Sequence, residues 1–167
     1  MEAKAVVFDL DGTLANTASL TTGRRRPYHV LRLCPPGGDT SQIAFEDGRQ
    51  DLPGLLITRC YRTAIVTASP LPYASTLCDL LGIDFERLLP AGSSSKTRRL
   101  LLLSQEWEIA PKSIVYVGDQ DVDREAAREA GCQFVPVHQI NRIWHLPDRC
   151  EPASPSQAPN EIGRRAR

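Results

Sequence analysis

The stretch Lys4-Ala5-Val6-Val7-Phe8-Asp9-Leu10-Asp11-Gly12-Thr13-Leu14 runs from an apolar segment into two carboxylates one residue apart. The apolar part predicts a buried strand, and residues i and i+2 of a strand face the same side. Asp9 and Asp11 can therefore address the same ligand, after which Gly12 lets the chain turn without a Cβ penalty. Buried carboxylates must be paired or bound to a cation, so the pattern predicts a phosphate-and-metal site. The alternative is an ordinary acidic turn that closes a buried strand.

The composition fits one domain and favours no class of charged partner. The chain has 167 residues, enough for a full core, and its 20 Lys plus Arg balance 20 Asp plus Glu. This balance gives no argument for a nucleic-acid or membrane partner. No apolar run approaches membrane-spanning length, and the N-terminal segment is typical of a core strand rather than a signal peptide.

The cysteines are odd in number and unclustered, at Cys34, Cys60, Cys78, Cys132 and Cys150. No two of them have the CxxC spacing of a redox or zinc motif. Such a set is typical of reduced thiols in an intracellular protein rather than of a disulfide framework. We therefore expect a cytoplasmic protein that does not associate with membranes.

Strand-like and helix-like segments alternate along the chain. The predicted strands are Lys4–Phe8, Thr63–Thr67, Arg87–Leu89, Ile114–Val117 and Gln133–Val137, and the last has Pro136 in it, which favours an edge position. The predicted helices are Gly54–Cys60, Ser69–Leu81, Lys96–Glu108 and Asp123–Ala130. This alternation predicts an α/β fold, a doubly wound Rossmann-like three-layer sandwich with a mainly parallel sheet of about five strands.

We expect one catalytic domain over residues 1–147 and a disordered tail over residues 148–167, where Pro, Ser, Glu and Arg dominate. Residues 18–51 are interrupted by Pro35-Pro36-Gly37-Gly38 and contain short β-leaning pieces at Tyr28–Leu33 and Ile43–Phe45. They favour a hairpin or an irregular flap inserted after the first strand over a helical domain.

Polar residues suited to phosphate chemistry follow three of the predicted strands. Asp9 and Asp11 follow the first, Thr67 ends the second, and Asp119 follows the fourth. In a doubly wound sheet, ligands bind outside the carboxyl ends of the strands. Lys96 opens a helix before the fourth strand, and Asp123 opens the helix after it. Taken singly, Thr67 could cap a helix, Lys96 could be a solvated charge, and the acids could be turn or N-cap residues.

In this order the motifs resemble the haloacid dehalogenase superfamily, in particular its phosphatase-like branch with a minimal cap or none. The resemblance covers the chain from the first strand to Val137, apart from the insertion. It is carried by Asp9-Leu10-Asp11-Gly12-Thr13, by Thr67 in Ile65-Val66-Thr67-Ala68-Ser69, by Lys96, and by Val117-Gly118-Asp119-Gln120-Asp121-Val122-Asp123.

The resemblance implies a role for each matched residue. Asp9 would be the nucleophile that forms an aspartyl-phosphate, and Asp11 the general acid and base. Thr67, Ala68 and Lys96 would bind the phosphoryl group. Mg²⁺ would be held by Asp9, Asp119 and the backbone carbonyl of Asp11, because magnesium favours oxygen ligands from one or two carboxylates. Asp123 would orient Asp119, the metal waters or Lys96.

The acid at position 11 favours a hydrolase over an ion pump or a dehalogenase, in the terms of this resemblance. Neither the interval after the first motif nor that from Ala68 to Ser95 has room for a full cap domain. The site would then be open, admitting a bulky or macromolecular phosphate, or be closed by a neighbouring subunit. The missing cap disfavours a phosphotransferase or phosphomutase, which must exclude water.

The basic run Arg24-Arg25-Arg26 lies in the insertion, where it could contact an anionic substrate. The substrates considered are a nucleotide, a nucleic-acid end or a phosphoprotein. A solvated charge run on a loop is the alternative. The sequence does not predict the oligomeric state.

Two rival functions use the same kinds of residue. A signalling receiver domain also combines Asp, Thr and Lys on a doubly wound sheet, but here the second acidic cluster comes last in the chain, after Lys96. That order argues against a receiver. A non-catalytic regulatory or scaffolding protein that keeps the fold remains open, because fold does not fix function.

Overall fold

The computed structural model describes residues 2–18, 31, 34, 37–91 and 95–150. Its centre is a parallel sheet of five strands in the order β3-β2-β1-β4-β5. The strands are β1 (Ala5–Phe8), β2 (Arg62–Thr67), β3 (Arg87–Pro90), β4 (Ile114–Gly118) and β5 (Gln133–Pro136). The predicted doubly wound α/β fold is confirmed, and Pro136 lies on an edge strand as its missing N–H requires.

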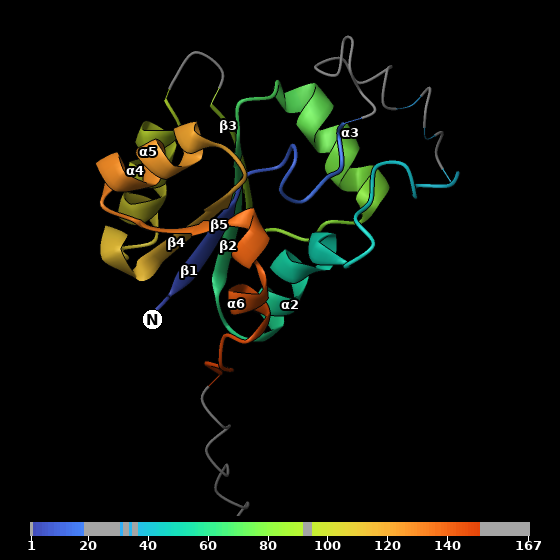
Figure 1. Cartoon of the computed structure of the whole chain (residues 1–167). Helices are drawn as coiled ribbons and strands as arrows, with labels where there is room; N and C mark the ends of the chain where they lie inside the picture. The colour runs from blue at the N-terminus through green and yellow to red at the C-terminus, as the bar shows by residue number, and fades with distance from the viewer. Residues whose placement is uncertain (1, 19–30, 32–33, 35–36, 92–94, 151–167) are drawn as a thin grey trace, which may run out of the picture.

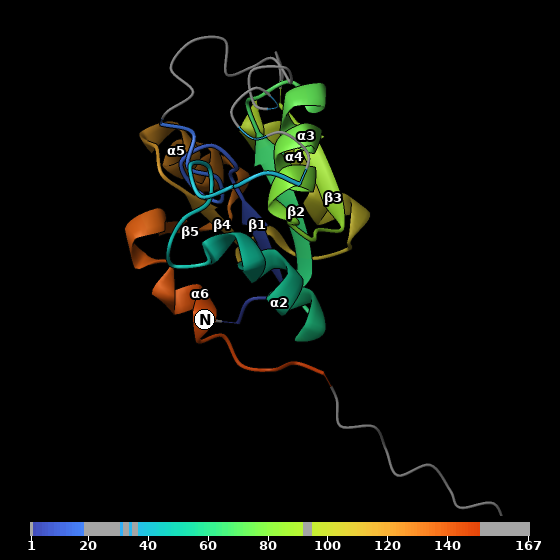
Figure 2. The same ribbon diagram turned by 90° about the vertical axis from the view of Figure 1, so that its right-hand side faces the viewer.

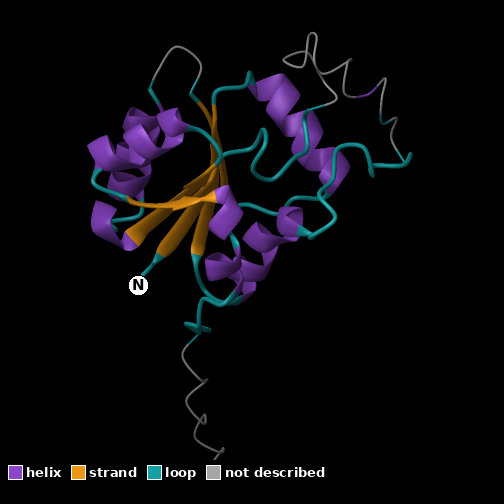
Figure 3. Ribbon diagram, viewed as in Figure 1, coloured by secondary structure: helices purple, strands orange, loops and turns teal. Residues whose placement is uncertain are grey.

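Helices cover both faces of the sheet and complete three layers (Figures 1 to 3). The helices are α2 (Leu52–Thr58), α3 (Leu71–Leu81), α4 (Lys96–Glu106), α5 (Asp121–Ala130) and α6 (Asn141–Trp144). Short 3₁₀ turns lie at Arg49–Asp51, Pro111–Ser113 and Val137–Gln139. None of the helices in the described part of the chain combines the length and the apolar character that crossing a bilayer needs.

The alternation of β1 divides the core into two halves. Val6 and Phe8 face one side, where they join buried side chains of α2, α3 and α6. Ala5 and Val7 face the other side, where they join buried side chains of α4 and α5. All four strand residues are fully buried, as expected for a central parallel strand covered on both faces.

The strand order reverses beside β1, and this reversal locates the site. From β1 the chain moves outward through β2 to β3, then crosses back to β4 and β5 on the other side of β1. β1 pairs in parallel with both β2 and β4. The carboxyl ends of these three strands therefore open onto one crevice, the usual ligand position of a doubly wound sheet.

The described residues of the insertion contain no hairpin, and Leu31, which lies in a stretch expected to lean toward strand, is helical. Residues 37–48 form turns and no strand, so the strand tendency of Ile43–Phe45 is overridden. Ile43 is instead fully buried in the core, and its carbonyl accepts a 2.8 Å hydrogen bond from the Asn16 N–H. Packing thus decides this segment rather than strand pairing. Arg24-Arg25-Arg26 lie outside the described residues.

The expectation that the thiols are all reduced is wrong for one pair. Cys60, just after α2, forms a disulfide with Cys150, 90 residues later. The two cysteines are far apart in sequence, and only the packing of the C-terminal segment against α2 brings them together. The thiol pattern therefore no longer argues for a cytoplasmic protein.

The same packing orders the beginning of the predicted tail. The Tyr61 hydroxyl donates to the Pro147 carbonyl at 2.9 Å, and the Arg149 N–H donates to the Arg59 carbonyl at 3.1 Å. The Arg149 guanidinium also donates to the Ala3 carbonyl. Residues 148–150 are thus part of the folded unit, while 151–167 lie outside the described residues. The division into one catalytic domain and a tail stays a prediction.

Candidate active site

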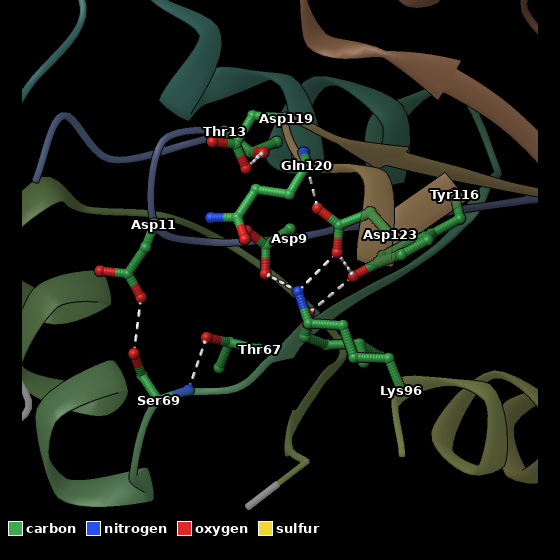
Figure 4. Close-up of polar contacts among 11 residues, drawn as sticks. Asp9, Asp11, Thr13, Thr67, Ser69, Lys96, Tyr116, Asp119, Gln120 and Asp123 are labelled. Carbon is green, nitrogen blue, oxygen red and sulfur yellow. Dashed lines mark hydrogen bonds and ion pairs between the residues drawn. The ribbon is translucent and has the colours of Figure 1, made fainter. Parts of the chain in front are cut away.

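Four charged side chains from separate parts of the chain meet at the carboxyl edge of the sheet (Figure 4). Asp9 follows β1, Asp119 follows β4, and Asp123 lies in the first turn of α5. Lys96 is the first residue of α4. The strand order makes this meeting possible, because β1 and β4 are neighbours and α4 and α5 cover the same face.

Lys96 joins two of the carboxylates. Its Nζ donates to Asp9 Oδ1 at 2.7 Å and to Asp123 Oδ1 at 2.6 Å. The side chains are 12% exposed for Lys96, 5% for Asp9 and none for Asp123, so water screens these ion pairs little. Burial lowers the pKa of Lys96, but Asp9 and Asp123 outweigh it, and the net pKa is raised. Lys96 therefore stays protonated, and its ammonium serves as a fixed positive charge rather than as an acid that gives up its proton.

Asp123 is held from several directions. It is the third residue of α5 and forms a capping box with Gln120, whose N–H donates to Asp123 Oδ2 at 3.1 Å. On the other oxygen, the buried Tyr116 hydroxyl lies 3.1 Å away, and it also lies 3.2 Å from the Val66 carbonyl. Both oxygens of Asp123 are thus engaged, which suits a residue that fixes Lys96 in place.

Two glycines make room for the acids. A Cβ at Gly118 would stand 2.6 Å from Asp123 Cγ, and a Cβ at Gly12 would collide with the Asp119 carboxylate. Gly12 also has φ of 80°, the left-handed region that favours glycine. Thr13, fully buried, donates from Oγ1 to Asp119 Oδ1 at 3.5 Å. The glycines of the first and fourth motifs therefore serve close approach to carboxylates.

The acids form a set that could hold a cation. One carboxylate oxygen each of Asp9, Asp119 and Asp123 lies within 4.8 Å of the others. Three carboxylates face one ammonium here, so the ionised cluster carries excess negative charge. Burial, together with the charges of Asp123 and Asp11, raises the pKa of Asp9 to about 7 against the opposing pull of Lys96. Burial and the charge of Asp123 likewise raise the pKa of Asp119.

An all-oxygen donor set with excess negative charge fits Mg²⁺. Asp9 and Asp119 fit the role of ligands best. Within the described residues, Asp9 accepts only through Oδ1, and the one side chain that donates to Asp119 is Thr13, at 3.5 Å. Asp123 is less suited, because both of its oxygens already accept hydrogen bonds.

Asp11 lies apart from this cluster, although the sequence places it beside Asp9. Its carboxylate is turned toward the start of α3 (Figure 4), where Ser69 Oγ donates to Oδ2 at 2.6 Å and the Tyr73 hydroxyl donates to Oδ1 at 2.9 Å. The extended alternation that would aim both acids at one ligand ends at Asp9, because Leu10 to Ala15 form a tight turn closed by hydrogen bonds to the Leu10 carbonyl.

Thr67 and Ala68 lie at the carboxyl end of β2, beside the cluster. Thr67 is almost fully buried, and its Oγ1 accepts the Ser69 N–H at 3.1 Å. A hydroxyl that accepts still has a proton to donate, which suits it to a phosphoryl oxygen. Ala68 is exposed, and together with Lys96 it lines a cavity of about 320 Å³.

Comparisons with known proteins point to one fold. No family model matches the chain. A curated relative, a phosphoglycolate phosphatase from Escherichia coli (strain K12), is 26% identical over 118 residues, covering 67% of this chain and 47% of the relative. The chain therefore spans about half the length of the curated relatives it matches.

Solved structures agree over most of the chain. A haloacid dehalogenase superfamily hydrolase from Geobacter sulfurreducens PCA aligns with a TM-score of 0.59 at 18% identity, covering 81% of this chain and 87% of that one. CbbY from Rhodobacter sphaeroides, solved in complex with phosphate, aligns with a TM-score of 0.60 at 20% identity, covering 80% and 85%. A magnesium complex of a family enzyme from Bacteroides thetaiotaomicron aligns at 0.53 and 13%, covering 81% and 93%.

The chain has the haloacid dehalogenase fold. The resemblance drawn from the motifs is thus confirmed at the level of the fold. Within that fold, the motif residues lie at the carboxyl edge of the sheet. Asp9, Asp119, Asp123 and Lys96 are brought together, Thr67 and Ala68 lie beside them, and the Asp11 carboxylate is turned away.

Several side chains of this haloacid dehalogenase fold were not expected at the site. Tyr116 lies within a continuous apolar strand, where the sequence gives no sign that its hydroxyl reaches Asp123. Ser69 and Tyr73 were assigned to a helix start, and only the structure shows that both bind Asp11. Thr13 belongs to the quoted first motif, so its position beside Asp119 could have been anticipated.

Proposed function

We propose that the chain is a magnesium-dependent phosphomonoester hydrolase that works through an aspartyl-phosphate at Asp9. The observation that carries this proposal is the buried Lys96 ammonium between Asp9 and Asp123, with Asp119 beside them. Asp9 Oδ2 accepts no hydrogen bond within the described residues, and it lies next to the fixed ammonium of Lys96. A free carboxylate oxygen beside a fixed cation is the arrangement that attack on a phosphate ester requires. The curated relative, named as a phosphoglycolate phosphatase, supports the same class of reaction.

Mg²⁺ would be held by Asp9, Asp119 and the backbone carbonyl of Asp11. When bound, it would neutralise charge on the substrate phosphate and on the neighbouring carboxylates. The magnesium complex of the structural neighbour from Bacteroides thetaiotaomicron supports this choice of ion. Because Gly12 has no Cβ, the Asp119 carboxylate can pack closely against the backbone at Gly12.

The reaction would take two steps. In the first, an Asp9 oxygen attacks phosphorus, the bond from phosphorus to the leaving oxygen breaks, and Asp11 gives that oxygen a proton. In the second, the Asp11 carboxylate takes a proton from water, the water oxygen attacks phosphorus, and the bond to Asp9 breaks. Inorganic phosphate leaves, and Asp9 returns to its starting state.

The phosphoryl group would be bound by Lys96 and by the end of β2. Lys96 supplies a charge whose position is fixed by Asp123, so little reorganisation is needed as the transition state forms. The Thr67 hydroxyl and the backbone at Ala68 supply further donors. The cavity beside Ala68 and Lys96 leaves this side of the site accessible.

We further propose that the site is open enough for a bulky or macromolecular phosphate, because residues 18–51 are too few for a full cap domain. Recognition of an anionic substrate by Arg24-Arg25-Arg26, such as a nucleotide, a nucleic-acid end or a phosphoprotein, remains part of this proposal. Glycolate chemistry belongs to the relative and is not carried over.

One observation is compatible with both the hydrolase and the non-catalytic alternative. The Asp11 carboxylate is bound by Ser69 and Tyr73 and is turned away from Asp9. A scaffolding or regulatory protein that kept the fold would need no acid and base over the nucleophile. The hydrolase proposal is preferred because Asp9, Lys96, Asp119 and Asp123, the residues needed for phosphoryl transfer, all lie together.

A phosphate-release assay over a panel of phosphomonoesters separates the two functions. The hydrolase proposal expects release with Mg²⁺, loss of release with a chelator, and a fall of at least about a thousandfold for Asp9→Asn, since Asn cannot form the acyl-phosphate. Asp121→Asn is the matched control, because Asp121 is exposed and pairs only with Arg124 in the described structure. Absence of release by the wild type on every ester would favour the alternative.

A further inference from the structure

Two hydroxyl groups that the proposed reaction does not use hold the Asp11 carboxylate. Ser69 Oγ donates to Oδ2 at 2.6 Å, and the Tyr73 hydroxyl donates to Oδ1 at 2.9 Å. Tyr73 is fully buried and Ser69 is 6% exposed. Each oxygen of Asp11 thus has its own buried donor, which fixes the direction of the carboxylate rather than only its distance.

Both hydroxyls come from the segment that also carries the phosphate-binding candidate Thr67. The Ser69 N–H donates to Thr67 Oγ1 at 3.1 Å, and Tyr73 lies one turn further on, within α3. The contacts of Asp11 and those of Lys96 lie on opposite sides of Asp9 (Figure 4). Lys96 and Asp123 occupy the side of α4 and α5, and Asp11 occupies the side of α3.

Hydroxyl partners suit a group that must alternate between acid and base. A hydroxyl can donate to a carboxylate and can also accept from a protonated carboxyl. Lys or Arg in the same place could only donate and would hold Asp11 in its ionised form. Ser69 can therefore stay in contact with Asp11 through both steps of a reaction in which the carboxyl gains and loses a proton.

We propose that Ser69 and Tyr73 are positioning residues that hold Asp11 on the α3 side of Asp9, so that the leaving group departs over the first turn of α3, opposite Lys96. This inference rests on the proposed hydrolase function. It adds two residues to the site and assigns the side of the crevice that the non-phosphate part of the substrate occupies. The exposed Leu71, the first residue of α3, borders that side.

The need for a directed acid depends on the leaving group, and this gives a selective test. An alkoxide must be protonated as its bond to phosphorus breaks, whereas a nitrophenolate leaves without a proton. If the Asp11 carboxylate is no longer held in a fixed orientation, the first step should therefore become slower for an alkyl phosphate. For nitrophenyl phosphate its rate should not change. General acid catalysis raises the reaction rate by about a hundredfold or more, and the orientation of the acid accounts for part of that increase.

The experiment compares kcat/KM for an alkyl phosphate and for nitrophenyl phosphate, because kcat/KM reports the steps up to phosphoryl transfer. For Tyr73→Phe and Ser69→Ala we expect the ratio of alkyl to aryl kcat/KM to fall by about tenfold. Ser69→Thr, which restores a hydroxyl, should return the ratio toward that of the wild type. Thr76→Ala is the control, since that hydroxyl on α3 donates only to the Pro72 carbonyl in the described structure.

Three outcomes would overturn the inference. An equal fall for both esters would show that the hydroxyls only stabilise the fold. No change in kcat/KM for either ester, or an increased ratio, would show that they do not direct the acid. If Tyr73→Phe does not fold, the comparison of Ser69→Ala with Ser69→Thr decides alone. A wild type that turns over neither ester would instead overturn the proposed function, which separates the two failures.

Discussion

At the scale of single residues, Gly12 shows how the first motif depends on the fourth. Its φ of 80° and its contact with Asp119 make two separate demands on the same position. The first concerns the backbone: a residue with positive φ is favoured to be glycine in any left-handed turn. The second is specific to this site, because the space that a Cβ would take is filled by a carboxylate proposed to bind the metal.

Gly12→Ala should therefore weaken Mg²⁺ binding, in addition to costing stability of about 1 kcal/mol or more from the strained backbone. We expect the dissociation constant for Mg²⁺, measured by calorimetry, to rise by about tenfold or more. Gly82→Ala is the matched control, since Gly82 has φ of 61° and open space where a Cβ would stand. Equal Mg²⁺ affinities in the two variants would contradict the steric role of Gly12.

The sequence predicts some site residues and not others for a physical reason. Asp9, Thr67 and Asp119 directly follow or end predicted strands, so the rule for ligand positions in parallel sheets is enough to group them. Tyr116 acts through the end of a long side chain whose Cα lies inside a strand. The direction of the Asp11 carboxylate depends on Ser69 and Tyr73, which local sequence cannot place.

At the scale of elements, α4 shows what packing adds to the pattern. Its leucines run consecutively from Leu100 to Leu103, and the helical spacing predicts an apolar face made of Leu100, Leu101, Leu103 and Trp107. This prediction is wrong for Leu101. In the structure Leu100 and Leu103 are fully buried, while Leu101 and Leu102 are each 39% exposed. The buried pair fixes the helix that carries Lys96 against β1 and β2.

Leu103→Ala and Leu102→Ala test this division within one helix. We expect the first to lower the free energy of unfolding by about 2–5 kcal/mol, because it leaves a cavity in the core. The second removes a partly exposed side chain and should cost about 1 kcal/mol or less. Urea unfolding followed by circular dichroism measures both, and similar losses would mean that the assigned face of α4 is wrong.

Element boundaries were predicted within a few residues where caps mark them, as at Gly82 and Gly131, which end α3 and α5 in the left-handed conformation. The structure of the insertion was harder to predict, because packing of Ile43 into the core, and not the local sequence pattern, decides its conformation. α6 was not predicted, since a helix of four residues has no readable periodicity.

At the scale of the whole molecule, the disulfide ties the C-terminal segment to the chain just after α2. Cys60 and Cys150 close a loop of 90 residues that contains β2 to β5. The contacts of Tyr61 with Pro147 and of Arg149 with Ala3 lie in the same region. The C-terminal segment is thus attached at the edge of the sheet opposite to the candidate site.

Removing this cross-link should lower stability without changing the chemistry of the site. For a loop of this length, chain entropy predicts a loss of up to about 4–5 kcal/mol for Cys150→Ser. Cys132→Ser, at a free cysteine, is the control for the substitution itself. Thermal unfolding with and without a thiol reductant should distinguish the wild type from Cys150→Ser only in the absence of reductant. No such difference would mean that the disulfide does not form.

The most direct test of the central claim is the covalent state of Asp9 during turnover. Wild type mixed with Mg²⁺ and a reactive phosphate ester is quenched in acid, and the intact mass and the peptide masses are measured. We predict one added phosphoryl group on the peptide that contains Asp9, more of it in Asp11→Asn, where hydrolysis lacks its base, and none in Asp9→Asn. Turnover that persists in Asp9→Asn with no phosphorylated peptide in any variant would contradict the account.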